Sequence, residues 1–380
     1  MEVNLKQSVA VKTVENRRDL RRFIYFPYAL YRKTYSNKSW VPPLLIDEKV
    51  LHDKNRHPFH KHADVQNFIA LRDGQMVGRI TAIKDSRYIE FKKQNTGYFG
   101  FFECIDDESV SRELFGHAVS WCAERGMDKI IGPINPTPSH ILGCLLNDFE
   151  TPPMIQIPYN LPFYPRLIEN SGFEKDEDHF AYIMDEKAEL SEKMVKVAEY
   201  AKRRGNITFR SANMRKFAQE KELVKELWNE AWEENSDFVP WTDEDFEHLA
   251  KDLKQIIIPE MAFFAYVDGD PAGVSITLPN INEILVTMNG RLFPFGLMKL
   301  LLGRRKIKTA RFAMMGIRNK YKNRGIDALF ACETFRRGRE LGFQKAEFSL
   351  ILEENFKLRK TLESWGAWPY RTYRIYAQSI

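Results

Sequence analysis

Hydrophobic and polar residues follow one another in the same order in two halves of the chain. The stretches 65–83 and 263–278 each contain two apolar runs that flank a short turn built on Asp-Gly. Runs rich in β-branched and aromatic residues on both sides of such a turn predict a β-hairpin. Each half is therefore expected to contain a hairpin of the same kind.

The elements predicted after each hairpin also match. A strand is followed by an amphipathic helix that ends at a glycine, then by a second strand, a short helix and a final strand. In the first half these elements fall at 97–105, 109–126, 127–134, 164–173 and 179–184. In the second half they fall at 308–317, 326–342, 344–352, 356–368 and 370–377. The order β-β-β-α-β-α-β thus occurs twice, about 200 residues apart, which indicates an internal duplication.

The duplication predicts an α/β protein of two domains. A length of 380 residues also favours two domains, because single hydrophobic cores rarely grow so large. We place the N-terminal domain at 1–187, a charged linking helix at 188–205 and the C-terminal domain at 206–380. Residues 211–256 are predicted to form helices inserted before the second hairpin.

The composition is that of a globular protein, with 44% hydrophobic and 29% charged residues. No apolar run reaches the ~18 residues that a membrane-spanning helix needs, and the N-terminus lacks the apolar core of a secretory signal. The four cysteines show no CxxC spacing, which favours reduced thiols and a cytoplasmic location.

The charge is distributed unevenly along the chain. Residues 291–380 carry 20 Lys and Arg against 7 Asp and Glu, whereas residues 1–290 carry 37 against 45. A basic segment attracts a nucleotide cofactor, a nucleic acid or an anionic membrane surface. The sequence has no basic strand with interleaved aromatic residues and no base-reading motif, so a nucleic-acid partner is not expected.

The segment FAMMGIRNKYKNRGIDALF carries the strongest chemical signal. A predicted strand leads through the loop 322–327 into a helix. The start of a helix presents unbonded N–H groups and a partial positive charge. Gly325 allows close approach of the backbone to an anion, and Lys322 and Arg324 add positive charge. The loop is therefore a candidate pyrophosphate site, with a plain basic turn between strand and helix as the alternative.

This segment and the repeated order of elements resemble the GNAT (GCN5-related N-acetyltransferase) superfamily, whose loop has the form R/Q-x-x-G-x-G/A. The resemblance implies two tandem GNAT-like domains, each a mixed, mostly antiparallel sheet flanked by helices. It also implies acetyl-CoA or a longer acyl-CoA as co-substrate, with pyrophosphate on the loop and pantetheine on the separated strand before it and on a later Asn. The cofactor-binding residues that it implies are Met315, Gly316, Ile317, Lys322, Asn323, Arg324, Gly325, Ile326, Asp327 and Asn355.

Two positions depart from the family pattern. Asp327 stands where the family usually has Gly or Ala, and its carboxylate competes with phosphate for the same amides. Leu362 stands where members often have the tyrosine that protonates the thiolate leaving group. Tyr370 is a nearby candidate for that acid role, and a half-buried strand residue is the alternative for it.

The predicted helix LVKELWNEAWEEN supplies candidate catalytic bases. Glu230 and Glu234 are four residues apart and share one face of the helix. In GNAT folds the helices after the first strand line the acceptor site, so a carboxylate here can accept the proton of an amine. A solvated acidic face above buried tryptophans is the alternative.

The first half lacks the basic loop, because its corresponding strand runs into Asp106-Asp107-Glu108-Ser109. We therefore expect the second half alone to hold the cofactor and the first half to shape the acceptor site, an arrangement that resembles tandem acyltransferases such as the Fem peptidyltransferases. The long Pro-rich loop before residue 164 is a candidate acceptor-binding element, or else a rigid wedge between domains. Its candidate substrate-binding residues are Asn135, Ser139, Tyr159, Asn160 and Tyr164.

The stretches SWVPPL, GYFGFFE and GPINP in the first half resemble a bacterial group of two-domain GNAT proteins. Some members are candidate N-acyltransferases of bacterial sphingolipid synthesis. The resemblance implies a small-molecule or lipid amine as the acceptor.

Two further segments are candidate binding sites, one for a metal ion and one for a membrane or an acyl chain. His57, His60 and His62 lie close together, but Pro58 interrupts helical spacing and no cysteine or carboxylate pair flanks them, so no metal is expected. The segment 292–308 sets an apolar stretch beside four basic residues. It can make peripheral contact with a membrane or guide an acyl chain, and a core helix with a solvated end is the alternative.

These observations predict an acyl-CoA-dependent N-acyltransferase that moves an acetyl or longer acyl group to an amine. The alternative is a non-catalytic GNAT-fold module that binds a partner or an anionic membrane surface. The departures at Asp327 and Leu362 keep this alternative open.

Overall fold

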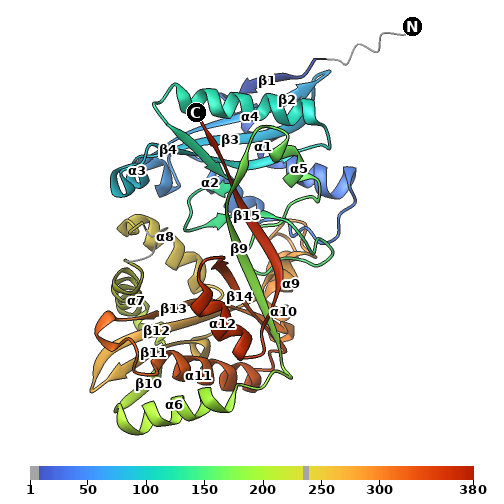
Figure 1. Cartoon of the computed structure of the whole chain (residues 1–380). Helices are drawn as coiled ribbons and strands as arrows, with labels where there is room; N and C mark the ends of the chain where they lie inside the picture. Colours follow the sequence, from blue (N-terminus) through green and yellow to red (C-terminus); the bar gives the residue numbers. More distant parts are fainter. Residues whose placement is uncertain (1–7, 234–238) are drawn as a thin grey trace. The chain divides into compact units, whose positions relative to one another are not determined.

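The structure, a computed structural model, describes residues 8–233 and 239–380, which form two compact units (Figure 1). Unit 1 contains the described residues up to His179 together with 285–299 and 371–380. Unit 2 contains residues 180–284 and 300–370. The candidate base Glu234 lies outside the described residues.

Unit 1 is built on a sheet in the order β1-β2-β3-β4-β5-β15. All of its strand pairs are antiparallel except β4–β5. Helix α4 packs on β2 and β3 through buried apolar residues such as Leu114 and Ala118. Its elements are β1 Ala10–Thr13, α1 Arg17–Ala29, α2 Leu45–Leu51, β2 Ala63–Arg72, β3 Gln75–Asp85, α3 Ser86–Lys92, β4 Thr96–Cys104, α4 Glu108–Ala123, β5 Lys129–Gly132, β6 Ile134–Asn135, β7 Ile141–Leu142, β8 Cys144–Leu145, α5 Tyr164–Glu169 and the end of β15 Trp368–Ser379.

Unit 2 repeats this plan in the order β9-β14-β13-β12-β11-β10. Its pairs β10–β11, β11–β12 and β12–β13 are antiparallel, and β13–β14 is parallel. Its elements, some of which begin or end in unit 1, are β9 Glu174–Asp185, α6 Glu192–Arg204, β10 Ile207–Ser211, α7 Phe217–Trp232, α8 Asp243–Lys254, β11 Ala262–Val267, β12 Asp270–Pro279, α9 Asn282–Leu285, α10 Gly296–Gly303, β13 Thr309–Ile317, α11 Ile326–Glu340, β14 Lys345–Leu352 and α12 Phe356–Ser364.

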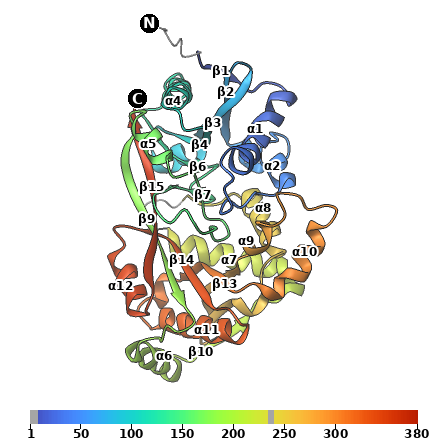
Figure 2. The same ribbon diagram turned by 90° about the vertical axis from the view of Figure 1, so that its right-hand side faces the viewer.

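The predicted repeat is present in both units. The two expected hairpins are β2–β3 and β11–β12, and the expected strand-helix-strand units are β4-α4-β5 and β13-α11-β14. The helix expected to link the domains is α6, which lies beside α11 in both views (Figures 1 and 2). Met194, Ala198 and Ala201 of α6 are buried in the core of unit 2, so this helix is part of that unit.

The last strands of the two halves cross between the units, which the sequence pattern did not predict. Strand β9 begins in unit 1 and continues from Phe180 in unit 2, whereas β15 begins in unit 2 and ends in unit 1. In unit 1, Tyr376 of β15 is paired with Gly132 of β5. Alternating polarity determines which face of a strand is buried but not which strand it pairs with. The pattern therefore could not predict that β9 and β15 each belong to both units.

Among the described residues, no helix combines the length and the apolar character that crossing a bilayer requires.

Unit 1 encloses a largely buried carboxyl group. Tyr164 Oη donates a 2.6 Å hydrogen bond to Glu103 Oε2, and Arg79 Nη2 lies 4.0 Å from Glu103 Oε1. Burial raises the pKa of Glu103 to about 7 in spite of the nearby arginine. Burial also lowers the pKa of the neighbouring His52 to about 3. The fold therefore holds Glu103 protonated and His52 neutral in mildly acidic solution.

We expect the effect of Glu103→Gln on the free energy of unfolding to depend on pH. The variant should gain stability relative to the unaltered protein between pH 5 and pH 8. The raised pKa means that the stability contributed by Glu103 is complete below about pH 4.5 and is lost as the pH rises through about 7. Glutamine cannot ionise, so the difference in unfolding free energy should shift toward the variant by roughly 3 kcal/mol between these pH values. Urea unfolding of both proteins at each pH measures it. His52 is common to both and cancels, and a difference independent of pH would contradict the assignment.

Candidate functional site

The central feature of unit 2 is a fork between its two parallel strands. Strands β13 and β14 pair only over their first four residues, from Thr309 opposite Lys345 to Phe312 opposite Phe348. Both strands then continue, to Ile317 and Leu352, without further pairing between them. The separation of the strands implied by the family resemblance is therefore present.

The predicted residues Met315, Gly316 and Ile317 lie on the separated part of β13. On the other side they are held by β12, with Gly316 opposite Val274. The register between β12 and β13 shifts at Ile276/Thr277, beside the point where the fork opens. Because β14 does not pair with this part of β13, the free edge of β13 can offer backbone hydrogen bonds to an extended ligand.

The loop after β13 ends at a glycine in a backbone conformation that favours glycine. Gly325 is the N-cap of α11 and has φ of 77°, in the left-handed region. A Cβ atom added there would lie 3.0 Å from Ala201 Cβ and 3.2 Å from Val197 Cγ1 of α6. Both the backbone conformation and the packing of α6 therefore favour glycine at the start of α11.

The start of α11 is open to an anion. The first backbone bond of the helix runs from Leu329 N to Gly325 O, 3.1 Å, so the amides that precede Leu329 keep the free N–H groups of a helix start. Ile326 is buried and anchors the turn, whereas Asp327 is exposed and makes no hydrogen bond or ion pair with the described residues. The carboxylate of Asp327 therefore does not plug the amides.

Positive charge surrounds this helix start. Lys322, Asn323 and Arg324 are exposed, and the Arg324 guanidinium lies 5.3 Å from the centre of the Tyr321 ring. The amides, the glycine and these cations together fit a pyrophosphate group. Asn355, the predicted pantetheine contact, caps α12 by accepting the N–H of Leu358 at 3.1 Å, which leaves its amide nitrogen for a ligand.

The equivalent positions of unit 1 are occupied by the chain itself. Asp107 caps α4 by accepting the N–H of Ser109 at 2.8 Å, and Arg72 forms an ion pair with the same carboxylate. Strands β4 and β5 also part, after Tyr98 opposite Ile131, but Asn135 Oδ1 accepts the N–H of Phe101 at 2.5 Å. In unit 1 a side chain therefore caps the helix start, and another side chain takes the Phe101 amide in the fork.

Glu230, a predicted base, faces a buried cation. Arg318, which follows β13, is buried, and its Nε atom lies 3.2 Å from Glu230 Oε2. Glu226 of the same helix also forms an ion pair with Arg318. Glu230 therefore neutralises an arginine at the end of β13, and its role as a base stays a prediction.

Tyr370 lies beside a carboxyl group that sequence reasoning missed. Its hydroxyl donates a hydrogen bond to Glu347, which is completely buried on β14. Ser349 Oγ donates to Glu347 Oε1 at 2.6 Å, and Arg311 Nε donates to Ser349 Oγ at 3.2 Å. Glu347 and Ser349 flank Phe348, the last paired residue of β14, so this cluster lies where the fork opens. The available signal was a glutamate within the otherwise apolar strand KAEFSLIL.

Four of the predicted acceptor-binding residues hold unit 1 together. Asn135 binds the amide of Phe101, and Asn160 binds the amide of Leu145 at 2.6 Å. Tyr159 donates to Phe149 O, and Tyr164 to Glu103. Ser139, in contrast, is exposed. The contacts of Asn135, Asn160, Tyr159 and Tyr164 therefore stabilise the loop and the sheet of unit 1.

The three histidines considered for metal binding have separate partners. His60 Nε2 lies 2.9 Å from Leu51 O, and His62 Nδ1 lies 3.0 Å from Asp85 Oδ1. His57 Nδ1 accepts the N–H of Phe59. In the described parts of the chain, no set of three or more His, Cys, Asp or Glu side chains is placed to hold a metal ion.

Comparison with known proteins adds two close relatives and a common fold. The chain is 35% identical over 97% of its length to Protein YghO of Escherichia coli (strain K12), covering 95% of that protein. It is 32% identical to the bacterial ceramide synthase of Caulobacter vibrioides, with 98% of each chain covered. A tandem GNAT protein from the clavulanic acid biosynthesis pathway superposes with a TM-score of 0.57 at 10% identity, with 98% of each chain covered. No protein-family model matches the chain.

The chain belongs to the family of YghO and the bacterial ceramide synthase. Its fold is that of a tandem GNAT protein, with a mixed sheet and flanking helices in each unit, as the sequence predicted. In this fold, β13, the loop 322–327 and α11 lie where the sequence predicted the signature segment, and the helix start there is open.

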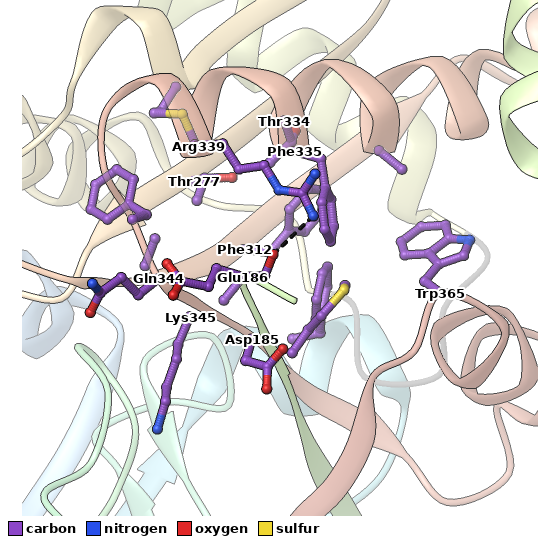
Figure 3. A pocket seen from close by; sticks show the side chains of 18 residues that line it. Asp185, Glu186, Thr277, Phe312, Thr334, Phe335, Arg339, Gln344, Lys345 and Trp365 are labelled. Carbon is purple, nitrogen blue, oxygen red and sulfur yellow. Dashed lines mark hydrogen bonds between the residues drawn. The ribbon is translucent and has the colours of Figure 1, made fainter. Parts of the chain in front are cut away.

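Two cavities flank the GNAT sheet of unit 2. The first lies between α11 and the base of the fork, lined by Phe312, Phe348, Phe335 and Trp365, with Arg339 Nη2 donating to Glu186 O at 3.0 Å (Figure 3). The hydroxyls of Thr277 and Thr334, which are buried on its wall, have no hydrogen-bond partner among the described residues.

The second cavity lies between the sheet and helices α7 and α8. Its volume is ≈ 70 Å³, more than the ~30 Å³ that one water molecule takes up in the liquid. Apolar residues dominate its lining, including Val224, Leu249, Leu253, Phe264 and Ile276. Met314, from the separated part of β13, also lines it. The cavity thus reaches from the fork into an apolar space.

We expect Asp327→Asn to strengthen coenzyme A binding. The exposed carboxylate lies in the first turn of α11 and repels a pyrophosphate at the same helix start. Removal of one such charge should lower the dissociation constant roughly two- to fivefold, and Arg324→Ala should raise it by a similar factor. Titration calorimetry with coenzyme A at low salt measures both.

Glu340→Gln is the matched control, because Glu340 is the last residue of the same helix and far from its start. The control should bind as the unaltered protein does. Equal dissociation constants for all four proteins would show that the start of α11 is not the phosphate site.

Proposed function

We propose that the protein is an acyl-CoA-dependent N-acyltransferase whose acceptor is a lipid amine. The proposal depends on one observation: unit 2 contains both a strand fork and, after it, an open helix start capped by a glycine. Extended backbone edges suit the amides of pantetheine, and the helix start suits its pyrophosphate.

The relatives support the choice of acceptor. One of the two is named a bacterial ceramide synthase, and a ceramide is a long-chain amine that carries an N-linked acyl group. The identity of 32% extends over nearly the whole chain, which supports the same architecture and the transfer of an acyl group to a long-chain amine. A long acyl group and a long-chain amine are therefore the first substrates to test.

Acyl-CoA supplies the acyl group: the amine nitrogen forms a bond to the thioester carbon, the carbon–sulfur bond breaks, and the thiol leaves. The amine loses one proton and the sulfur gains one. The chain must therefore provide a group that accepts a proton and a group that donates one near the fork.

Glu347 and Tyr370 are the pair proposed for this proton transfer. Tyr370 donates its hydroxyl proton to the sulfur, Glu347 receives the proton of the amine, and the hydrogen bond between them restores both. Ser349 and Arg311 fix the position of the carboxylate. The cluster replaces the tyrosine that the family often has at position 362, where a buried leucine packs in the core.

The apolar cavity beside α7 and α8 is the proposed site of the acyl chain. Met314 connects it to the separated strand of the fork, and its lining offers few polar groups to a hydrocarbon. Burial of methylene groups in such a space stabilises a long chain by ~0.8 kcal/mol for each CH₂. Acyl chains longer than acetyl are therefore the expected donors.

Substitution of the proton-transfer pair tests the proposal. Glu347→Gln and Tyr370→Phe should each lower kcat by about 10²-fold or more, because the proton path is broken, while coenzyme A binds as before. Release of free thiol from palmitoyl-CoA in the presence of a long-chain amine measures kcat, and calorimetry measures binding. Tyr25→Phe, a half-buried tyrosine of α1, is the matched control.

The outcomes separate the alternatives. A protein that binds coenzyme A but transfers no acyl group to any amine tested is the non-catalytic GNAT-fold module. A protein that binds neither coenzyme A nor palmitoyl-CoA at millimolar concentration has no cofactor site of the kind proposed. Normal kcat in both variants would remove the pair from the mechanism and leave the cofactor site standing.

We expect Val224→Phe to change the preference for acyl length. The larger side chain reduces the apolar cavity lined by α7 and α8, so kcat/KM should fall about tenfold or more for palmitoyl-CoA, since several methylene groups lose their contacts. The value for acetyl-CoA should stay within about twofold. Val119→Phe on α4 of unit 1 is the control, and an equal loss for both acyl lengths would place the chain elsewhere.

A further inference from the structure

The segment around α10 exposes large apolar side chains to a degree found at few other places in the described chain. Leu302 is 70% exposed and Phe293 is 68% exposed. We call residues 293–302 the apolar ridge. Its exposed apolar side chains are Phe293, Phe295, Leu297, Met298, Leu301 and Leu302.

Within the ridge, helix geometry gathers these side chains on one face. In α10, Leu297 and Leu301 are four residues apart, as are Met298 and Leu302, so all four lie within a single arc of the helix. Phe293 and Phe295 precede the helix and extend the same apolar stretch along the chain. The expected alternative of a buried core helix does not hold for this face, because its side chains point to solvent.

Basic residues outnumber acidic ones beside the ridge, where Glu283 accepts the N–H groups of Lys308 and Thr309. Residues 286–308 contain Arg291, Lys299, Arg304, Arg305, Lys306 and Lys308 and no Asp or Glu. Arg291, Arg305 and Lys306 are exposed, and their side chains have no hydrogen-bond or ion-pair partner among the described residues. Unpaired cations beside exposed hydrocarbon are complementary to a surface that is apolar inside and anionic outside.

This combination selects among possible occupants. A large exposed apolar patch with a polar rim marks an interaction surface. A second copy of the chain in a twofold contact would bring the same cations of the two chains together, which is unfavourable. An anionic bilayer offers hydrocarbon for the ridge and phosphate groups for the cations at the same time.

We propose that the apolar ridge and its basic residues dock the protein on the surface of an anionic lipid bilayer. The ridge enters the boundary between headgroups and acyl chains, and Arg291, Arg305 and Lys306 contact lipid phosphates. The attachment is peripheral, since α10 has eight residues and cannot cross the bilayer. The proposal rests on exposure and charge and holds whether or not the transferase reaction occurs.

Sedimentation with lipid vesicles tests the proposal. We expect the full chain to sediment with vesicles of equal parts phosphatidylcholine and phosphatidylglycerol, and to remain in solution with phosphatidylcholine alone. Leu301→Ser with Leu302→Ser should reduce the partition coefficient roughly tenfold or more. Arg305→Glu with Lys306→Glu should have a similar effect that high salt abolishes, since screening removes the attraction that it measures.

Matched controls are available at other exposed positions. Ile46→Ser with Phe91→Ser removes exposed apolar residues of unit 1, and Arg17→Glu with Arg18→Glu reverses exposed charges on α1. Both should partition as the unaltered protein does. Thermal unfolding of every variant should be unchanged, because all of the positions are exposed.

Three results would overturn the proposal. One is failure of the unaltered protein to sediment with the anionic vesicles, and another is equal partition of the ridge variant and its control. The third is a dimer, seen by light scattering, that dissociates in the Leu301→Ser, Leu302→Ser variant, since the ridge would then be covered by a second copy.

Discussion

The parting of β13 and β14 after Phe312 and Phe348 is the constraint on which the candidate site depends. A parallel pair that stayed closed would satisfy its own backbone groups and leave nothing for an extended ligand. The register of β12–β13 shifts beside this point, and such irregularities are often accompanied by a bend in the strand. Met314 of β13 lines the apolar cavity, while the strand continues toward the loop that ends at Gly325. The fork thus opens beside an irregularity of the sheet, and the strand that borders it leads both to the cavity and to the helix start.

The two units show how the same fold can keep or lose such a site. In unit 1 the corresponding helix start is capped by Asp107, and Asn135 takes the amide of Phe101 in the fork. In unit 2 the helix start is capped by a glycine that has no side chain, so its amides have no internal acceptor. A side-chain cap stabilises a helix by about 1 kcal/mol, and unit 2 forgoes it at α11. The loss is consistent with a site kept for an anionic ligand.

The resemblance in sequence predicted the fold and the signature segment because both are encoded by local patterns. The Asp-Gly turns, the alternating strands and the glycine at position 325 act over a few residues. The cluster at the opening of the fork was not predictable in this way. Tyr370 and Glu347 are 23 residues apart, and Arg311 and Ser349 are 38 residues apart. Glu230 was predicted on the correct helix, but its ion pair with Arg318, 88 positions later in the chain, could not be deduced from spacing.

The sequence by itself determined the order of elements, the duplication, the basic C-terminal stretch and the place of the glycine-containing loop before α11. Only the tertiary structure decided that the last strands cross between the units, that Asp107 closes one helix start while Asp327 leaves the other open, and that the side chains of α10 face solvent. The reason is physical: turns, caps and periodicity depend on neighbours in the chain, whereas strand pairing, burial and ion pairing depend on residues that only folding brings together.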